Sequence, residues 1–273
     1  MNSSKLFSLS ALSLLMLASA DGALVAYWNL NESSGNVADS SGNGLTGTAS
    51  AGGLTYSQGS VTAGTYGALT VDSTTAAAFG SSVAFTRASS GSFTVPGTAG
   101  GVLESLAEAG PSTGSFTVMA WINTSGLPAS TTYRVFGTGP NGGWGLGVAN
   151  VDRLKFTTFG NTDYLSTGTA GFNGNWHHIA VTWNNGTVTS YVDGNVFALG
   201  SAATTFTDEA GTIFRIGSNS NNTDFFNGRI DELKIYNTAM NVNQIRLEAV
   251  AVPEPSVALI GSLGLLALVR RRC

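Results

Sequence analysis

Cysteine is almost absent from this chain of 273 residues, and the one cysteine, Cys273, is the last residue. An internal disulfide, a cysteine-based metal site and a cysteine nucleophile are therefore excluded from the body of the protein. Charge is also scarce, since Asp, Glu, Lys and Arg make up 10% of the residues. Residues 21–250 hold eight Lys and Arg against fifteen Asp and Glu, which leaves a formal charge of −7. Without clustered positive charge, nucleic acid is excluded as a partner.

The rest of the composition describes a folded domain. Hydrophobic residues make up 42% of the chain, and five Trp and fourteen Phe supply apolar surface. That surface suffices for a core, so disorder of the whole chain is excluded. A domain of this length folds on burial alone, and the span between the two ends fits one large domain rather than two.

The first residues follow the pattern of a secretory signal peptide. A positive charge at Lys5 precedes an apolar run over residues 6–17, and a small-residue site ends at Ala20. This order is typical of a segment that is removed on export. We expect residues 1–20 to be the signal peptide, with cleavage after Ala20, and a buried N-terminal helix is the alternative.

The last segment, residues 250–273, combines three features in order. Two prolines around Glu254 keep the chain extended, an apolar run covers residues 257–269, and three arginines follow. The run of about 13 residues makes a helix of about 20 Å, which is short of the roughly 30 Å hydrocarbon core of a bilayer. A permanent membrane anchor is therefore the weaker alternative.

This order resembles the PEP-CTERM sorting signal of Gram-negative bacteria, here at Pro253, Glu254, Pro255, Arg270, Arg271 and Arg272. The resemblance implies a short C-terminal transmembrane helix that anchors the chain transiently in the inner membrane, with the body on the periplasmic side. It also implies a partner, an exosortase-type membrane transpeptidase that cuts near the motif. The product would then reach the cell surface or the extracellular matrix. Cys273 departs from the usual basic ending, and nothing in the sequence explains it.

The body shows the signals of antiparallel β-structure. The apolar stretch 115–123 fits a strand that is buried on both faces. Asn185-Gly186 and Asp193-Gly194 each separate two β-rich runs, and both pairs favour type I′ hairpin turns. We therefore expect a three-strand meander from residue 176 onward. Further strands are expected at 23–30, 83–85, 92–95, 134–138, 144–148, 154–159, 213–216 and 230–236.

Helix is scarce in the sequence. One short helix fits residues 102–109, and residues 241–250 add another, with Asn241 and Gln244 spaced as a capping box. Residues 46–75 have few large apolar side chains, so we expect long loops there with at most one weak strand. Many short strands separated by turns predict an all-β sandwich or barrel.

Four stretches, 27–48, 82–123, 176–197 and 216–245, together resemble the LamG-like, concanavalin A-like jelly-roll family. The resemblance assigns residues 21–249 to one such domain and implies two packed antiparallel sheets. It also implies that the first and last strands lie side by side. The loop that holds Asp39 would then approach Asp231.

A local catalytic motif is missing. The laminarinase-type enzymes of this fold carry Glu-x-Asp-x-x-Glu, which is absent here, and no Gly-x-Ser-x-Gly elbow occurs. Asp231 and Glu232 are adjacent, so a regular strand directs them to opposite faces. His177 shares strand parity with apolar residues and is expected against the core. We expect a protein that is not an enzyme, and a glycan hydrolase or lyase with dispersed carboxylates is the alternative.

The loop 38–47 is rich in oxygen donors, among them the carboxylate of Asp39 and the amide oxygen of Asn43. Calcium prefers six to eight such ligands. In the resembling family this loop and the last strand share one structural calcium ion, which implies Asp39 and Asn43 with Asp231 or Glu232 as ligands here. The alternative is a plain Asx turn at Asp39.

Aromatic side chains in loops and turns point to carbohydrate as the ligand. Trp144 stands between glycines and Tyr164 lies near a turn, so both are candidates to stack on a sugar ring. Core packing is the alternative for Trp144, because tryptophan is buried on average. We expect a partner that is a polysaccharide or extracellular matrix, and a purely structural coat protein is the remaining alternative.

Overall fold

The computed structural model describes residues 22–97, 103, 106, 114–127, 131–138, 142–149, 152–197 and 213–251. The predicted signal peptide, the sorting segment with its three arginines, and most of the predicted helix at 102–109 lie outside these residues. The described residues contain no helix that is long and apolar enough to cross a membrane.

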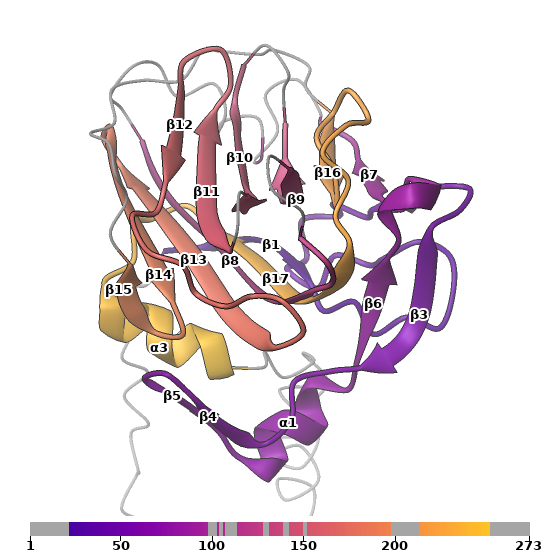
Figure 1. Ribbon diagram of the computed structural model, residues 1–273, viewed down its shortest axis with the longest axis horizontal. Coiled ribbons are helices and arrows are strands. Elements are labelled where there is room, and N and C mark those ends of the chain that lie inside the picture. Colours follow the sequence, from indigo (N-terminus) through magenta and orange to yellow (C-terminus); the bar gives the residue numbers. More distant parts are fainter. Residues whose placement is uncertain are drawn as a thin grey trace, which may run out of the picture.

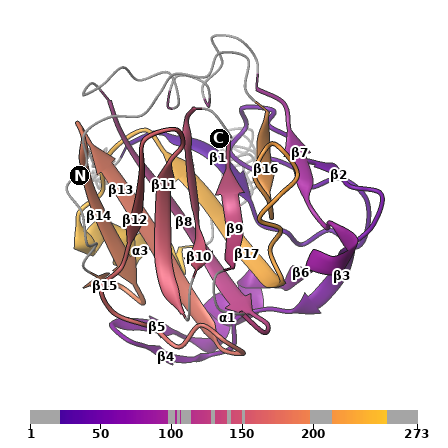
Figure 2. The same cartoon turned by 45° about the horizontal axis from the view of Figure 1, so that its top comes forward.

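All the described strands except β4 and β5 belong to two antiparallel sheets that face each other (Figures 1 and 2). The 8-stranded sheet runs in the order β15-β14-β13-β8-β17-β6-β3, and β1 pairs with β17. Its strands are β1 (Leu24–Trp28), β3 (Leu54–Gly59), β6 (Ser81–Phe85), β8 (Ser115–Thr124), β13 (Trp176–Asn184), β14 (Thr187–Val192), β15 (Asn195–Phe197) and β17 (Gly228–Tyr236).

The 7-stranded sheet runs in the order β12-β11-β10-β9-β16-β7-β2. Its strands are β2 (Thr48–Ala49), β7 (Phe93–Val95), β9 (Thr132–Gly137), β10 (Trp144–Ala149), β11 (Arg153–Thr158), β12 (Thr162–Leu165) and β16 (Phe214–Ile216). The strands are out of sequence order in both sheets, and every pair between them is antiparallel. The predicted two-sheet jelly-roll sandwich is therefore confirmed.

Strand β8 shows how the sequence builds the sheet. Alternate residues Phe116, Val118, Ala120 and Ile122 enter the core between the sheets. Met119 and Trp121 point to the other face, where they belong to two smaller apolar clusters. Both faces of this strand are therefore covered, as its unbroken apolar pattern predicts.

The two predicted hairpin turns are present. Asn185 and Gly186 have φ values of 46° and 89°, and Asp193 and Gly194 have φ values of 50° and 71°. Both central residues of each turn are left-handed, as a type I′ turn requires. The first turn joins β13 to β14 and the second joins β14 to β15, so the predicted meander is confirmed.

A further layer covers the outer face of the 8-stranded sheet (Figure 1). It consists of the hairpin β4 (Gly64–Tyr66) and β5 (Leu69–Val71), helix α1 (Ser73–Phe79) and helix α3 (Val242–Val250). The capping box predicted at Asn241 and Gln244 begins α3. The loops predicted for residues 46–75 were wrong, because β2 to β5 lie within that range.

Candidate functional site

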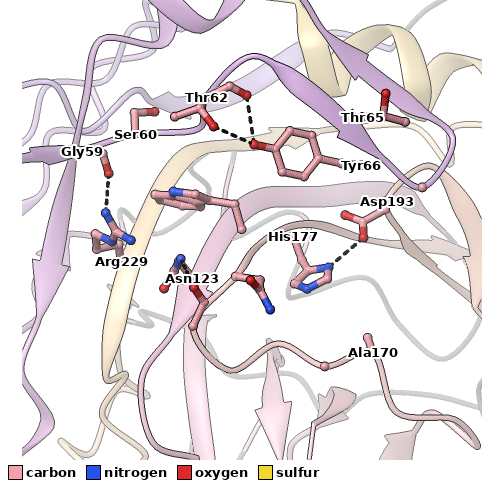
Figure 3. Close-up of a pocket in the computed structure, with 15 residues that line it drawn as sticks. Gly59, Ser60, Thr62, Thr65, Tyr66, Asn123, Ala170, His177, Asp193 and Arg229 are labelled. Atoms are coloured by element: carbon pink, nitrogen blue, oxygen red, sulfur yellow. Dashed lines mark hydrogen bonds and ion pairs between the residues drawn. The ribbon is translucent and has the colours of Figure 1, made fainter.

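An open groove of about 810 Å³ lies where the outer layer meets the 8-stranded sheet (Figure 3). One wall is the segment 59–67, which includes β4 and the first residue of the turn to β5. The other walls come from the ends of β8 and β17, the segment 170–177 and the Asp193 turn. The groove therefore joins parts of the chain that are far apart in the sequence.

The hairpin wall contacts the 8-stranded sheet through hydrogen bonds and close packing. The N–H of Ala68 donates to the carbonyl of Asp193 at 2.9 Å. Gly67 lies so close to Asp193 that a β-carbon would come within 2.7 Å of the aspartate side chain, and its φ of 54° is left-handed. Tyr66 packs edge-on against Trp121, with ring centres 5.0 Å apart, and its hydroxyl donates to the carbonyl of Thr62 at 2.9 Å.

Arg229 and Trp176 lie together in the groove. The guanidinium carbon is 5.1 Å from the centre of the indole ring, within the range of a cation–π contact. Nη1 of Arg229 donates to the carbonyl of Gly59 at 2.8 Å. Nearby, the side-chain amide of Asn123 donates to the carbonyl of Gly174 at 3.1 Å. The groove thus combines aromatic rings with fixed polar groups.

A histidine–aspartate pair closes the other end of the groove in Figure 3. Nδ1 of His177 lies 2.7 Å from a carboxylate oxygen of Asp193, and the second oxygen accepts the N–H of His178 at 2.8 Å. The His177 ring stands edge-on to Phe172 of the main core, which confirms its predicted core contact. The carboxylate of Asp193 is therefore committed to these two partners.

The four residues proposed as calcium ligands do not converge on one point. Both oxygens of Asp39 accept hydrogen bonds, from the N–H groups of Tyr27, Ser41 and Leu45 and from the Ser41 hydroxyl. Asn43 directs its amide N–H₂ to the carbonyls of Leu24 and Val25. A cation at Asp39 would have to displace N–H donors, so this loop has the geometry of an Asx turn.

Glu232 accepts the hydroxyl of Tyr27 at 2.8 and 2.9 Å, whereas Asp39 binds the backbone N–H of the same tyrosine. The two carboxylates therefore lie at opposite ends of one residue. No group of three or more His, Cys, Asp or Glu in the described part of the chain is placed to hold a metal ion. The donor set does not fit a shared calcium ion, although the predicted approach of β1 to β17 is confirmed.

A β-bulge changes the faces of the two adjacent acids. The register of β17 against β8 shifts between Asp231 and Lys234, and Glu232 has a φ of 51°. As a result both carboxylates join one buried polar cluster with Lys234, and the expectation that they point to opposite faces was wrong. Asp231 accepts the hydroxyl of Ser60, and Glu232 lies 3.6 Å from Nζ of Lys234.

Burial governs the protonation of this cluster. Burial raises the pKa of Asp231 well above its usual range, and the neighbouring Glu232 raises it further. Burial also raises the pKa of Glu232 and lowers the pKa of Lys234. Nζ of Lys234 donates to the carbonyls of Glu248 and Ala251 at the C-terminal end of α3. These hydrogen bonds attach the end of α3 to β17. The cluster thus fixes the outer layer on the sheet.

Trp144 and Tyr164 do not form a sugar-binding surface. Both side chains are 0% exposed and belong to the main core. The indole of Trp144 stacks on Phe116 with ring centres 4.6 Å apart. The stacking role predicted for these two residues was therefore wrong, since neither ring reaches solvent.

Two aromatic residues that do line the groove, Tyr66 and Trp176, were not among the predicted site residues. Tyr66 falls in the range 46–75 where loops were expected, and Trp176 was considered as the start of the predicted meander. Trp176 is half-buried and packs against the small outer cluster around Trp121. The Gly and Asn residues that precede Trp176 were an available signal of an exposed strand end.

A laminin G-type family model, described as the concanavalin A-like lectin/glucanases superfamily, matches residues 96–246. The hairpin wall of the groove, residues 59–67, lies outside the matched range. A search of curated proteins found no match.

Solved structures of several carbohydrate-active proteins share the fold. A Trypanosoma rangeli sialidase in complex with sialic acid aligns with a TM-score of 0.58 and 15% identity, over 84% of this chain and 33% of that chain. Domain 4 of AbnA, an extracellular arabinanase from Geobacillus stearothermophilus, in complex with arabinotriose, aligns with a TM-score of 0.53 and 22% identity, over 84% and 99% of the two chains.

The binding domain of Paraclostridial Mosquitocidal Protein 1 aligns with a TM-score of 0.54 and 19% identity, over 83% of this chain and 51% of that chain. The chain thus spans about a third of the sialidase, and about half of the mosquitocidal protein's binding domain. At these identities the alignments establish the fold. The family match covers more than half of the chain, and this protein belongs to the concanavalin A-like lectin/glucanase superfamily.

Proposed function

We propose that this domain binds carbohydrate without catalysis, and that the ligand lies in the groove beside the β4–β5 hairpin. One observation carries the proposal: the half-buried aromatic residues Tyr66 and Trp176 line the same open cavity as Asn123 and Arg229. A sugar ring has an apolar C–H face and a polar rim. Aromatic surface with a few fixed polar groups is the chemistry that such a ligand needs.

The solved structures support this proposal. Domain 4 of the arabinanase AbnA binds arabinotriose, and the alignment covers 99% of that domain. The present chain has the same fold. One wall of its groove, residues 59–67, lies outside the range that the family model matches. The groove, rather than the fold, therefore carries the proposal for a ligand.

The carboxylates favour binding over hydrolysis. Glycoside hydrolysis ordinarily uses two carboxyl groups on either side of the bond to be cleaved. In the groove, Asp193 is committed to His177 and to the N–H of His178. Asp231 and Glu232 are 0% and 2% exposed, so a substrate does not reach them.

The test uses two matched tyrosines. Tyr66 and Tyr56 are both half-buried, both pack edge-on against an aromatic ring, and both donate their hydroxyl to a backbone carbonyl. Tyr66 lines the groove, whereas Tyr56 lies on β3 and is not part of its lining. After a glycan array has identified a ligand, titration calorimetry compares Tyr66→Ala with Tyr56→Ala.

We expect Tyr66→Ala to weaken binding about tenfold, because it removes roughly 1–2 kcal/mol of aromatic contact. Tyr56→Ala should leave the Kd unchanged. Equal effects of the two substitutions, or an array with no bound glycan, would contradict the proposal.

We further propose that the domain is exported and then released by an exosortase-type transpeptidase. The proposal rests on the Pro253-Glu254-Pro255 motif, the apolar run after it and the terminal arginines. Mass spectrometry of the protein from a Gram-negative host with and without an exosortase tests it. A C-terminus trimmed near Pro253 only in the exosortase host is expected, and identical products in both hosts would refute the proposal.

A further inference from the structure

We propose that the groove selects an acidic sugar, whose carboxylate or sulfate group binds the guanidinium of Arg229. The inference rests on the proposed function, since it concerns the ligand of the same groove. It goes further by assigning the ligand a charge and naming the residue that recognises it.

Arg229 is held in place before any ligand arrives. Nη1 donates to the carbonyl of Gly59 at 2.8 Å, and the guanidinium carbon lies over the indole of Trp176, 5.1 Å from the ring centre. An arginine has five N–H donors, and among the described residues this single carbonyl takes one of them. Arg229 is half-buried and lines the groove (Figure 3), so the remaining donors are available to a ligand there.

The charge of Arg229 is not balanced by a neighbouring acid. In the described part of the chain, Arg134, Lys155 and Lys234 each lie within 4.0 Å of a carboxylate, whereas Arg229 and four other arginines do not. Of these five arginines, Arg229 is the one that lines the groove. Among the described residues that line the groove, the one carboxylate belongs to Asp193, which is paired with His177. A guanidinium without an acid partner inside the groove marks the groove as a place for an anion.

The acid two residues further along β17 does not supply that charge. The carboxylate of Asp231 is fully buried and is bound by the Ser60 hydroxyl and the N–H of Glu232. Burial and the adjacent Glu232 raise its pKa well above the usual range, which favours the uncharged form. Asp231 therefore does not neutralise the guanidinium, whose positive charge remains available to a ligand.

The geometry favours a sugar over a free anion. Planar N–H donors match the two oxygens of a carboxylate or a sulfate. Tyr66 lines the same groove and offers apolar surface for the ring that carries the acid group. A uronic acid and a sulfated sugar share this chemistry, and the experiment separates them.

The experiment titrates the full-length protein with an oligogalacturonate, its methyl ester and a sulfated galactan oligosaccharide. Three variants are compared. Arg229→Gln removes the positive charge, and Arg229→Lys keeps the charge but lacks the planar N–H donors of a guanidinium. The third variant is Arg215→Gln. Arg215 is the matched control, because it is half-buried and hydrogen-bonded to Thr94 and Ser220 on the other sheet. Circular dichroism confirms that each variant is folded.

We expect the wild type to bind an acidic sugar about tenfold or more tightly than the methyl ester, the size of one charge-assisted hydrogen-bonding group. Arg229→Gln should abolish that difference, Arg229→Lys should restore part of it, and Arg215→Gln should preserve it. Preference for the uronate identifies a carboxylate ligand, and preference for the sulfated sugar identifies a sulfate ligand.

Equal binding of acidic and neutral sugars, with Arg229→Gln unchanged, would overturn the charge selection and leave the carbohydrate groove intact. Binding of no sugar would overturn both proposals. Equal loss of selectivity in Arg215→Gln would also overturn the inference, because general electrostatics rather than Arg229 would then explain it.

Discussion

The buried imidazole of His178 gives a sharp test of the outer layer. His178 is 1% exposed and stands edge-on to Trp121, with ring centres 5.4 Å apart, beneath the layer formed by the hairpin and α3. Burial lowers its pKa from 6.5 to about 3, and the charge of Lys234 adds to the effect. The native protein thus holds this histidine in the uncharged form across most of the acidic range.

The sign follows from which state binds the proton. Between about pH 6.5 and pH 3 the unfolded chain takes up a proton at His178 that the native state does not. This contribution to stability is therefore complete above pH 6.5 and is lost as the pH falls. At pH 5 the loss is 1.5 pH units at 1.36 kcal/mol each, or about 2 kcal/mol.

The wild-type curve alone does not isolate this term. Asp231 and Glu232 have raised pKa values, so they stabilise the native state as the pH falls. We therefore compare the wild type with His178→Phe, which keeps a ring beside Trp121 and removes the titrating group. The assay is urea unfolding of both proteins at pH 7 and pH 5.

The difference in unfolding free energy between wild type and His178→Phe should shift by about 2 kcal/mol in favour of the variant at pH 5. A difference that stays constant between the two pH values would refute the reasoning. It would mean that His178 is not buried, and hence that the hairpin and α3 do not cover the sheet as described.

Three further predictions concern stability. Asn241→Ala removes the cap of α3, so urea unfolding should show a loss of about 1 kcal/mol, and no loss would contradict the capping box. Trp144→Ala should cost about 4 kcal/mol, because it leaves a cavity in the main core, and an unchanged stability would contradict its burial. Asp39→Ala should lower the thermal midpoint equally in calcium and in chelator, since this carboxylate binds N–H donors; a calcium-dependent midpoint that the variant loses would restore the predicted metal site.

Local signals predicted much of the fold. The turns at Asn185-Gly186 and Asp193-Gly194 are specified by residues that tolerate left-handed backbone, so the meander was predictable. The capping box at Asn241 is likewise specified by residues within a stretch of four, because Asn241 and Gln244 bond to each other's backbone. Features of this kind depend on neighbours in the sequence, which is why sequence analysis finds them.

The hairpin β4–β5 was not predictable in this way. Its strands are short, and Leu69 and Val71 become buried only against the cluster around Trp121. Trp121 is distant from the hairpin in the sequence, so no local sequence pattern predicts the hairpin. Because the hairpin forms a wall of the groove, the groove was missed together with it.

The bulge at Glu232 explains why the predicted orientation of the adjacent acids Asp231 and Glu232 was wrong. Strand parity assumes a regular ladder, and one left-handed residue moves the carboxylate of Glu232 to the face of Asp231 and Lys234. The aromatic candidates failed for a different reason. Glycines around Trp144 suggested an exposed ring, but the ring is buried and stacks on Phe116 of the opposite, 8-stranded sheet.

The most direct test of the central claim is a crystal structure of the protein soaked with the oligosaccharide that it binds best. The account predicts that a sugar ring contacts Tyr66 and that its polar groups reach Arg229 and Asn123 in the groove beside the hairpin. A sugar bound instead on the open face of the 7-stranded sheet, with the groove free of ligand, would contradict it.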